Sequence, residues 1–192
     1  MISLFAALVI QTAANPAESP PAGTPTPDCS LSEADLTGNR ALTFEQFDQY
    51  RSTLRSTAWN LSMAGCHAAS AEADQDYLIH GPVLTDRQYV VVRWHMALSL
   101  ARAGREAEAI PLAAASIAPV EPSEDQFDWN TYVRGVWGFL TKRREVLDAS
   151  LITLKAAPGG RNAINARALG RLSKCFGRPY AEAVEAEICA VD

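Results

Sequence analysis

The chain has 192 residues, 48% of them apolar, and carries a formal net charge of -5 at pH 7. This length fits one domain with a sizeable core. The acidic balance and the absence of any run of Lys or Arg longer than three residues argue against nucleic acid as the partner, because no long basic segment is present to neutralise phosphates.

Residues 1–14 are typical of a secretory signal peptide. The segment MISLFAALVIQTAA has an apolar run followed by small residues, with Thr12 and Ala14 at the positions that signal peptidase reads. The run is shorter than the about 20 residues that cross a bilayer, so we expect no transmembrane segment in the mature chain. Because no Lys or Arg precedes the run, the alternative is a disordered apolar N-terminus or a misplaced start of the chain. Residues 15–28, rich in Pro and Ala, predict a linker, and residues 29–192 a helical domain.

Four cysteines follow the predicted cleavage site, and an even number in an exported chain predicts two disulfides. We favour Cys29 with Cys66 and Cys175 with Cys189, because each pair joins segments close in sequence. The second pair requires the last helix to end before Cys189, since otherwise the two residues would be displaced by about 12 Å along the helix axis. Four buried free thiols are the alternative.

The first long helix is predicted from a capping box. Thr43 followed by Gln46 is a helix start, and the apolar spacing after it predicts a helix through about Met63. A further helix, or a continuation of the first, extends through Ile79 and ends at Gly81.

Residues 85–118 are the best-marked stretch and predict two antiparallel helices. Thr85 and Gln88 form a second capping box, and Gly104 stands where a helix ends in the left-handed conformation. The first of these helices is apolar around most of its circumference, so it must be covered on more than one side. Pro111 either kinks the second helix or marks its start.

The C-terminal part predicts further helices. Residues 127–140 form an amphipathic pattern in which Gly135 and Gly138 flank the apolar stripe, so that a neighbouring helix could approach closely. Helices are then expected over 145–157, 162–176 and from Pro179 to about 188. No segment alternates with the period of a strand, so we expect an all-α fold.

One helical pair resembles a tetratricopeptide repeat, a two-helix unit that stacks into a solenoid. The residues that carry the resemblance are Ala97, Leu100, Gly104, Ala109 and a proline at Pro119 or Pro122. It covers roughly a third of the chain, and the unit from residue 127 departs from the pattern, with Arg144 in place of the glycine. The resemblance implies antiparallel hairpins stacked as a short solenoid, which binds a peptide or protein in a groove without catalysis.

Three residues are candidates for partner binding. Arg93 lies in the apolar face of its helix, where a charge must be paired or must reach an anionic ligand. The alternative is a structural arginine bonded to a carboxylate or to helix-end carbonyls. Trp94 and Arg134 lie near the positions that would line the concave face if the resemblance holds, and their alternatives are a core tryptophan and a solvated arginine.

No catalytic residue, metal ligand or cofactor site is assigned. Cys66 and His67 are adjacent, but neighbouring helical residues point about 100 degrees apart, and the histidines lack ligand spacing. Residues 35–47 echo part of an EF-hand loop, but Arg40 and Gln46 stand where calcium binding requires Gly and Glu.

We therefore expect an exported binding or assembly module that acts on a protein or peptide in the periplasm or envelope of a bacterium, or is secreted. Two alternatives remain. One is a small helical hydrolase-type enzyme with a site built from Arg93, His95 and scattered carboxylates. The other is an inhibitor or immunity-type protein that uses a convex surface. An open groove favours the module, and a closed pocket of converging titratable groups favours the enzyme.

Overall fold

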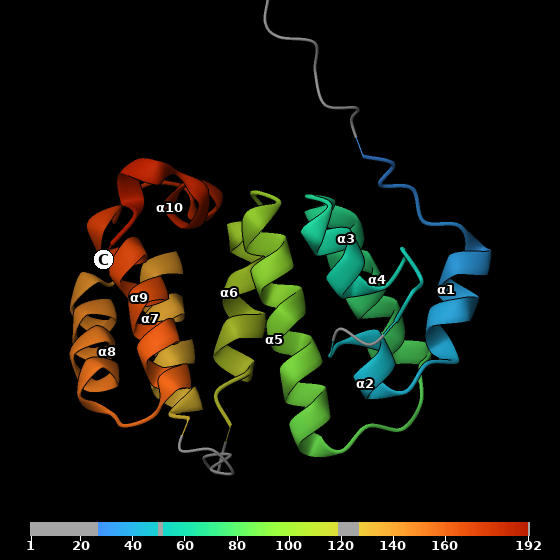
Figure 1. Cartoon of the computed structure of the whole chain (residues 1–192), viewed down its shortest axis with the longest axis horizontal. Helices are drawn as coiled ribbons and strands as arrows, with labels where there is room; N and C mark the ends of the chain where they lie inside the picture. Colours follow the sequence, from blue (N-terminus) through green and yellow to red (C-terminus); the bar gives the residue numbers. More distant parts are fainter. Residues whose placement is uncertain (1–26, 50–51, 119–126, 192) are drawn as a thin grey trace, which may run out of the picture.

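The computed structural model describes residues 27–49, 52–118 and 127–191, and in these ranges the chain is all-α, as predicted (Figure 1). The predicted signal peptide and most of the predicted linker lie outside the described residues. The helices are α1 (Glu33–Arg40), α2 (Phe44–Phe47), α3 (Ala58–Met63), α4 (His67–His80), α5 (Asp86–Arg102), α6 (Glu106–Ala115), α7 (Trp129–Leu140), α8 (Arg144–Ala156), α9 (Gly160–Lys174) and α10 (Tyr180–Glu185), followed by the 3-10 turn η1 (Glu187–Cys189). None of the described helices is long and apolar enough to cross a membrane.

From α3 to α9, consecutive helices pack on one another, so the chain builds a row of antiparallel neighbours (Figure 1). α5 stands inside this row, with α4 on one side and α6 on the other, as its nearly continuous apolar circumference predicts. α7 also packs against α9. The stack thereby places each helical hairpin beside the next.

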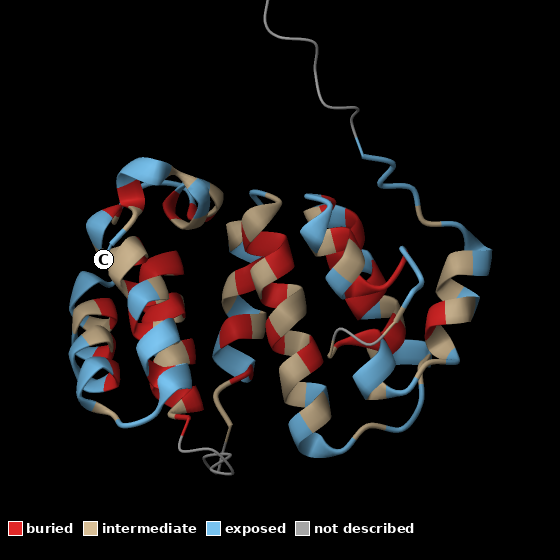
Figure 2. Cartoon of the chain, viewed as in Figure 1, coloured by how far each residue is buried: buried red, intermediate tan, exposed pale blue. Residues whose placement is uncertain are grey.

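Two hydrophobic cores meet at α5. Buried residues lie on α5 itself and on the helices on both sides of it (Figure 2). Val92 belongs to the smaller core under α2, α3 and α4, where the rings of Phe47 and Tyr77 stack with centroids 3.9 Å apart. The opposite side of α5 belongs to the larger core, which continues through α6 to α10. Because α5 contributes residues to both cores, the two halves of the row pack against the same helix.

Both capping boxes are present, but the long helix predicted from Thr43 to Met63 is wrong. α2 ends at Phe47, and the described residues between it and α3, 48–49 and 52–57, are not helical. Asparagine side chains satisfy the backbone of the intervening loop: the Asn39 amide donates to Ser56 O at 2.9 Å, and the Asn60 amide donates to Leu54 O at 2.5 Å. Hydrogen bonds to side chains therefore replace the helical bonds that the prediction assumed.

α6 runs through its proline without ending. Its first residue is Glu106, so Pro111 lies inside the helix and leaves the carbonyl of Ala107 without its usual helical donor. Ala107 is exposed, so water can take the place of the missing N–H.

Both predicted disulfides form. The Cα atoms of Cys29 and Cys66 are 5.2 Å apart, and those of Cys175 and Cys189 are 5.6 Å apart. α10 ends at Glu185 and the chain turns back through η1, which is the early helix end that the second pair requires.

The two glycines of α7 lie at close helix contacts, as predicted. A Cβ atom on Gly138 would lie 2.9 Å from the backbone nitrogen of Leu147 in α8, and one on Gly135 would lie 2.5 Å from a methyl carbon of Leu169 in α9. Backbone atoms cannot move aside as a side chain can, so Gly138 sets how closely α7 and α8 approach.

We expect Gly138→Ala to lower the free energy of unfolding by about 1–3 kcal/mol, because the added methyl group overpacks the helix contact. Urea unfolding followed by circular dichroism measures the change. The matched control is Gly160→Ala at the start of α9, where a Cβ atom meets nothing within 4 Å; this substitution should stabilise the protein by up to about 1 kcal/mol. Equal stabilisation by both substitutions would show that the contact between α7 and α8 can accommodate a methyl group at position 138.

Candidate functional site

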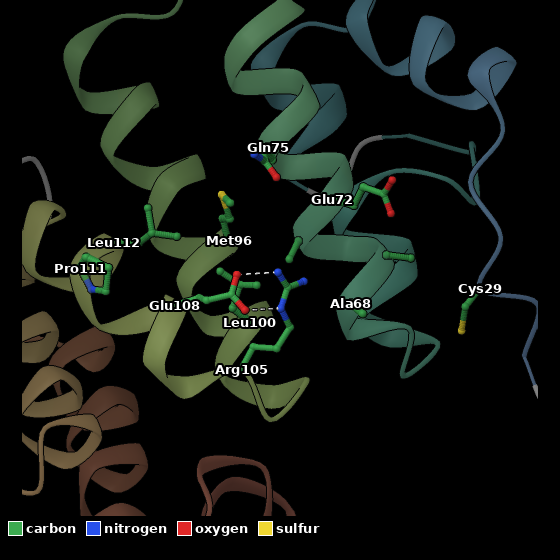
Figure 3. A pocket seen from close by; sticks show the side chains of 12 residues that line it. Cys29, Ala68, Glu72, Gln75, Met96, Leu100, Arg105, Glu108, Pro111 and Leu112 are labelled. Atoms are coloured by element: carbon green, nitrogen blue, oxygen red, sulfur yellow. Dashed lines mark hydrogen bonds and ion pairs between the residues drawn. The ribbon is translucent and has the colours of Figure 1, made fainter.

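An open groove of about 720 Å³ lies where α4 and α6 flank α5 (Figure 3). We call it the α4–α6 groove. The residues that line it come from the chain before α1, from the three helices and from the turn before α6: Cys29, Ala68, Ala69, Ala71, Glu72, Gln75, Met96, Leu100, Arg105, Glu108, Pro111 and Leu112.

The floor of this groove is apolar and its edges are charged. Met96 and Leu100 of α5 lie between the two flanking helices (Figure 3), and α4 lines the groove with the small side chains of Ala68, Ala69 and Ala71. On the α6 side, the guanidinium of Arg105 binds Glu108 through two hydrogen bonds of 2.7 and 2.6 Å. Hydrogen bonds from Arg105 lower the pKa of Glu108, so the pair stays ionised at neutral pH. With Glu72 on α4, two carboxylates and one guanidinium surround the groove.

Arg93 takes the structural arrangement considered for it from the sequence. Its guanidinium donates to the backbone oxygen of Ala115 and to Ser116 Oγ at the end of α6, the latter at 3.4 Å, and lies 5.4 Å from the centre of the Tyr89 ring. The charge is thus satisfied by the C-terminal end of a neighbouring helix.

Trp94 and Arg134 lie in different surroundings. Trp94 is only 2% exposed, and the centre of its ring system lies 6.1 Å from that of Trp129 and 5.6 Å from that of Tyr132, so the indole belongs to the core. Arg134 is exposed on α7. The structure does not bring these two residues and Arg93 into the α4–α6 groove, which other side chains line.

A second, smaller cavity of about 200 Å³ lies on another side of α4 and α5, beneath α3. We call it the polar cavity. Asp48, which follows α2, binds Nδ1 of His95 at 2.5 Å and also accepts from the Gln49 amide. The Ser70 hydroxyl donates to Ala58 O at 2.8 Å and lies 3.1 Å from the Ser99 hydroxyl. Acidic and hydroxyl groups from three elements therefore converge there.

Asp74 of α4 is the exception in this cavity, because neither of its carboxylate oxygens has a hydrogen-bond partner. The residue is 0% exposed. Burial, and secondarily the carboxylate of Asp48, raise the pKa of Asp74 well above its ordinary value. A carboxyl group in this position is held neutral at pH values where an exposed aspartate is ionised.

The polar cavity was not predicted from the sequence. Ser70 and Asp74 lie four residues apart on α4, and so do His95 and Ser99 on α5, which places each polar pair on one face of its helix. This spacing was the available signal, but nothing in the sequence showed that the two faces meet. In the part of the chain that the structure describes, no three His, Cys, Asp or Glu side chains come together in a way that could hold a metal ion.

The chain matches no protein-family model, no curated protein and no solved structure.

The raised pKa of Asp74 predicts how stability changes with pH. Above about pH 4 an unfolded aspartate loses its proton while folded Asp74 keeps it, so the free energy of unfolding should fall as pH rises towards the folded pKa. Asp74→Asn removes this decline and should stabilise the protein at pH 7 by about 1.4 kcal/mol for each unit of pKa elevation. Urea unfolding between pH 4 and 8 measures it.

Asp76→Asn, two residues further along α4, is the matched control with the opposite sign. Asp76 binds the Arg40 guanidinium at 2.8 and 2.7 Å, which lowers its pKa, so the neutral side chain should destabilise the protein at pH 7. If Asp74→Asn is also destabilising at pH 7, Asp74 is ionised and paired in solution.

Proposed function

We propose that the protein is an exported binding module that holds a segment of a peptide or protein partner in the α4–α6 groove. The observation that carries this proposal is the groove itself, which is open, apolar at its floor and charged at its edges. A rigid groove between helices is a common way to bind an apolar segment, and polar groups at its edges then fix the orientation of the segment.

The arrangement of the hairpins supports a tetratricopeptide-like scaffold. Ala97 and Ala109, two residues of the resemblance, are buried where α5 packs on α6, and Gly104 between the helices has a positive φ of 77°. Small residues permit a close helix contact and glycine permits the tight turn. These are the roles that a two-helix repeat requires of them.

The groove favours a partner segment that combines apolar and basic side chains. An apolar side chain of the partner would cover Met96 and Leu100, and removing that surface from water stabilises the complex. Lys or Arg on the same segment would meet Glu72 or the Arg105–Glu108 pair, where the carboxylates outnumber the guanidinium.

An exported location rests on two features. Two disulfides are typical of proteins from oxidising compartments, and residues 1–14 have the pattern of a secretory signal. We therefore place the binding module in the periplasm or envelope of a bacterium, or outside the cell.

The enzyme considered from the sequence receives less support. Its two central residues, Arg93 and His95, contact different parts of the molecule: the former binds the end of α6 and the latter binds Asp48. Asp48, Asp74 and His95 do converge in the polar cavity, but Arg93 does not line it, so the site considered for the enzyme is not assembled. An inhibitor or immunity-type protein would bind through a surface outside the groove, and the experiment below separates that case.

The test selects peptides from a random dodecapeptide library on the disulfide-bonded protein and compares two variants. Ala68→Arg places a long cation in the groove, whereas Ala149→Arg places the same side chain on exposed α8. We expect peptides with apolar and basic residues, whose Kd rises at least tenfold, or about 1.4 kcal/mol, with Ala68→Arg and stays unchanged with Ala149→Arg. Fluorescence anisotropy of labelled peptides measures Kd.

Amide chemical-shift changes on peptide addition provide the second readout. They should lie along α4, α5 and α6. Shifts confined to other helices, or selected peptides that bind Ala68→Arg as tightly as the unchanged protein, would overturn the proposal and favour the inhibitor-type surface.

A further inference from the structure

The polar cavity contains hydrogen-bond acceptors, the carboxylate oxygens of Asp74, that have no donor in the described part of the protein. Asp48, Ser70 and Ser99 each have a partner, but the two oxygens of Asp74 have none. Buried acceptors without a donor are rare in native proteins because their desolvation is not compensated. A fully buried carboxylate that lines a cavity is therefore evidence for a donor that occupies the cavity.

The charges around Asp74 favour a positive donor. The charged group that acts on Asp74 is a second carboxylate, that of Asp48. His95 is bound to Asp48 through Nδ1, and the guanidinium of Arg102, at another part of the wall, lies 5.9 Å from the centre of the Tyr180 ring. Neither Arg102 nor His95 of the cavity wall binds the carboxyl group of Asp74.

The serine hydroxyls add acceptors to the same space. Ser70 donates its hydrogen to Ala58 O, so the hydrogen between the two hydroxyls comes from Ser99. The oxygen of Ser99 keeps lone pairs for a further donor. An ammonium group has three N–H donors and no acceptor, which matches a carboxylate with a neighbouring hydroxyl.

The size of the polar cavity limits the ligand. A volume of about 200 Å³ is far larger than the 10–15 Å³ that one water requires and smaller than the 300 Å³ at which drug-sized pockets begin. Leu98 and Ala58 provide apolar surface beside the polar groups. A short aliphatic chain with one charged end fits these limits.

We propose that the polar cavity is a binding site for a small aliphatic primary amine, whose ammonium group donates hydrogen bonds to the carboxylate of Asp74. The amine enters as the ammonium ion and displaces the proton of the Asp74 carboxyl group to solvent, so one proton is released for each molecule bound. The site is separate from the α4–α6 groove and does not depend on the function proposed for it.

Isothermal titration of the disulfide-bonded protein with n-butylammonium tests the proposal, with 1-butanol and butyrate as uncharged and anionic probes of similar size. We expect n-butylammonium to bind at least tenfold more tightly than 1-butanol and butyrate not to bind. Titration in two buffers of different ionisation enthalpy should show the release of one proton at a pH where free Asp74 is protonated.

Three variants locate the site. Asp74→Asn keeps the shape of the side chain and should weaken n-butylammonium binding at least tenfold while the protein stays folded. Ser62 is half-buried on α3 and lines the cavity. Ser62→Leu leaves Asp74 intact but fills part of the cavity, and should weaken binding to a similar extent. Glu145→Gln removes one negative charge from the exposed surface of α8, away from both the groove and the cavity, and should leave binding unchanged.

Several results would overturn the assignment. Absence of n-butylammonium binding would mean that the cavity holds only water. Binding that survives Asp74→Asn would mean that the carboxylate is not the counter-ion. Butyrate binding as tight as that of n-butylammonium would identify an anion site formed by Arg102 and His95 instead.

Discussion

The packing of α5 on both sides determines the rest of this structure. A helix that is apolar around most of its circumference cannot lie on the surface of a single core, because one of its faces would remain in water. The chain resolves this constraint with two cores, one below α2 to α4 and one running from α6 to α10. Both the α4–α6 groove and the polar cavity lie against α5, so each candidate site is built on a helix that contributes to both cores.

The polar cavity results from the break between α2 and α3. If the helix continued past Phe47, Asp48 would be part of it. The segment before α3, which Asn39 and Asn60 bind through their side-chain amides, would then not form a loop. The break allows Asp48 to reach His95 on α5, 47 residues further along the chain. Disruption of a regular element here brings titratable groups from distant segments together, which is common at functional sites.

Sequence reasoning recovered the parts of the fold that depend on local chemistry. Capping boxes at Thr43 and Thr85, the close contact at Gly138 and both disulfide pairs depend on residue type and short spacing, and all five are present. The end of α2 was missed because it depends on hydrogen bonds from the distant side chain of Asn39. Tertiary partners of this kind override local propensity.

The candidate sites were harder to predict for the same reason. Arg93 was correctly identified as a charge that needs a partner, but the sequence could not show that the end of α6 supplies it. The burial of Asp74 could not be predicted, because acidic residues in an Ala-rich helix are usually exposed to solvent. Only the packing of α3 and α5 against α4 shows that this carboxyl group is enclosed.

The Cys29–Cys66 bond has a consequence for how the α4–α6 groove is presented. Cys29 lines that groove and is tied to the residue that precedes α4, so the point where the chain enters the domain is fixed at the edge of the groove (Figure 3). Anything joined to the amino-terminal side of Cys29 starts from that edge, and tethering of this kind raises effective concentration. A ligand bound in the groove and a group joined to Cys29 would thus be at high effective concentration relative to each other, even if they made no specific contact.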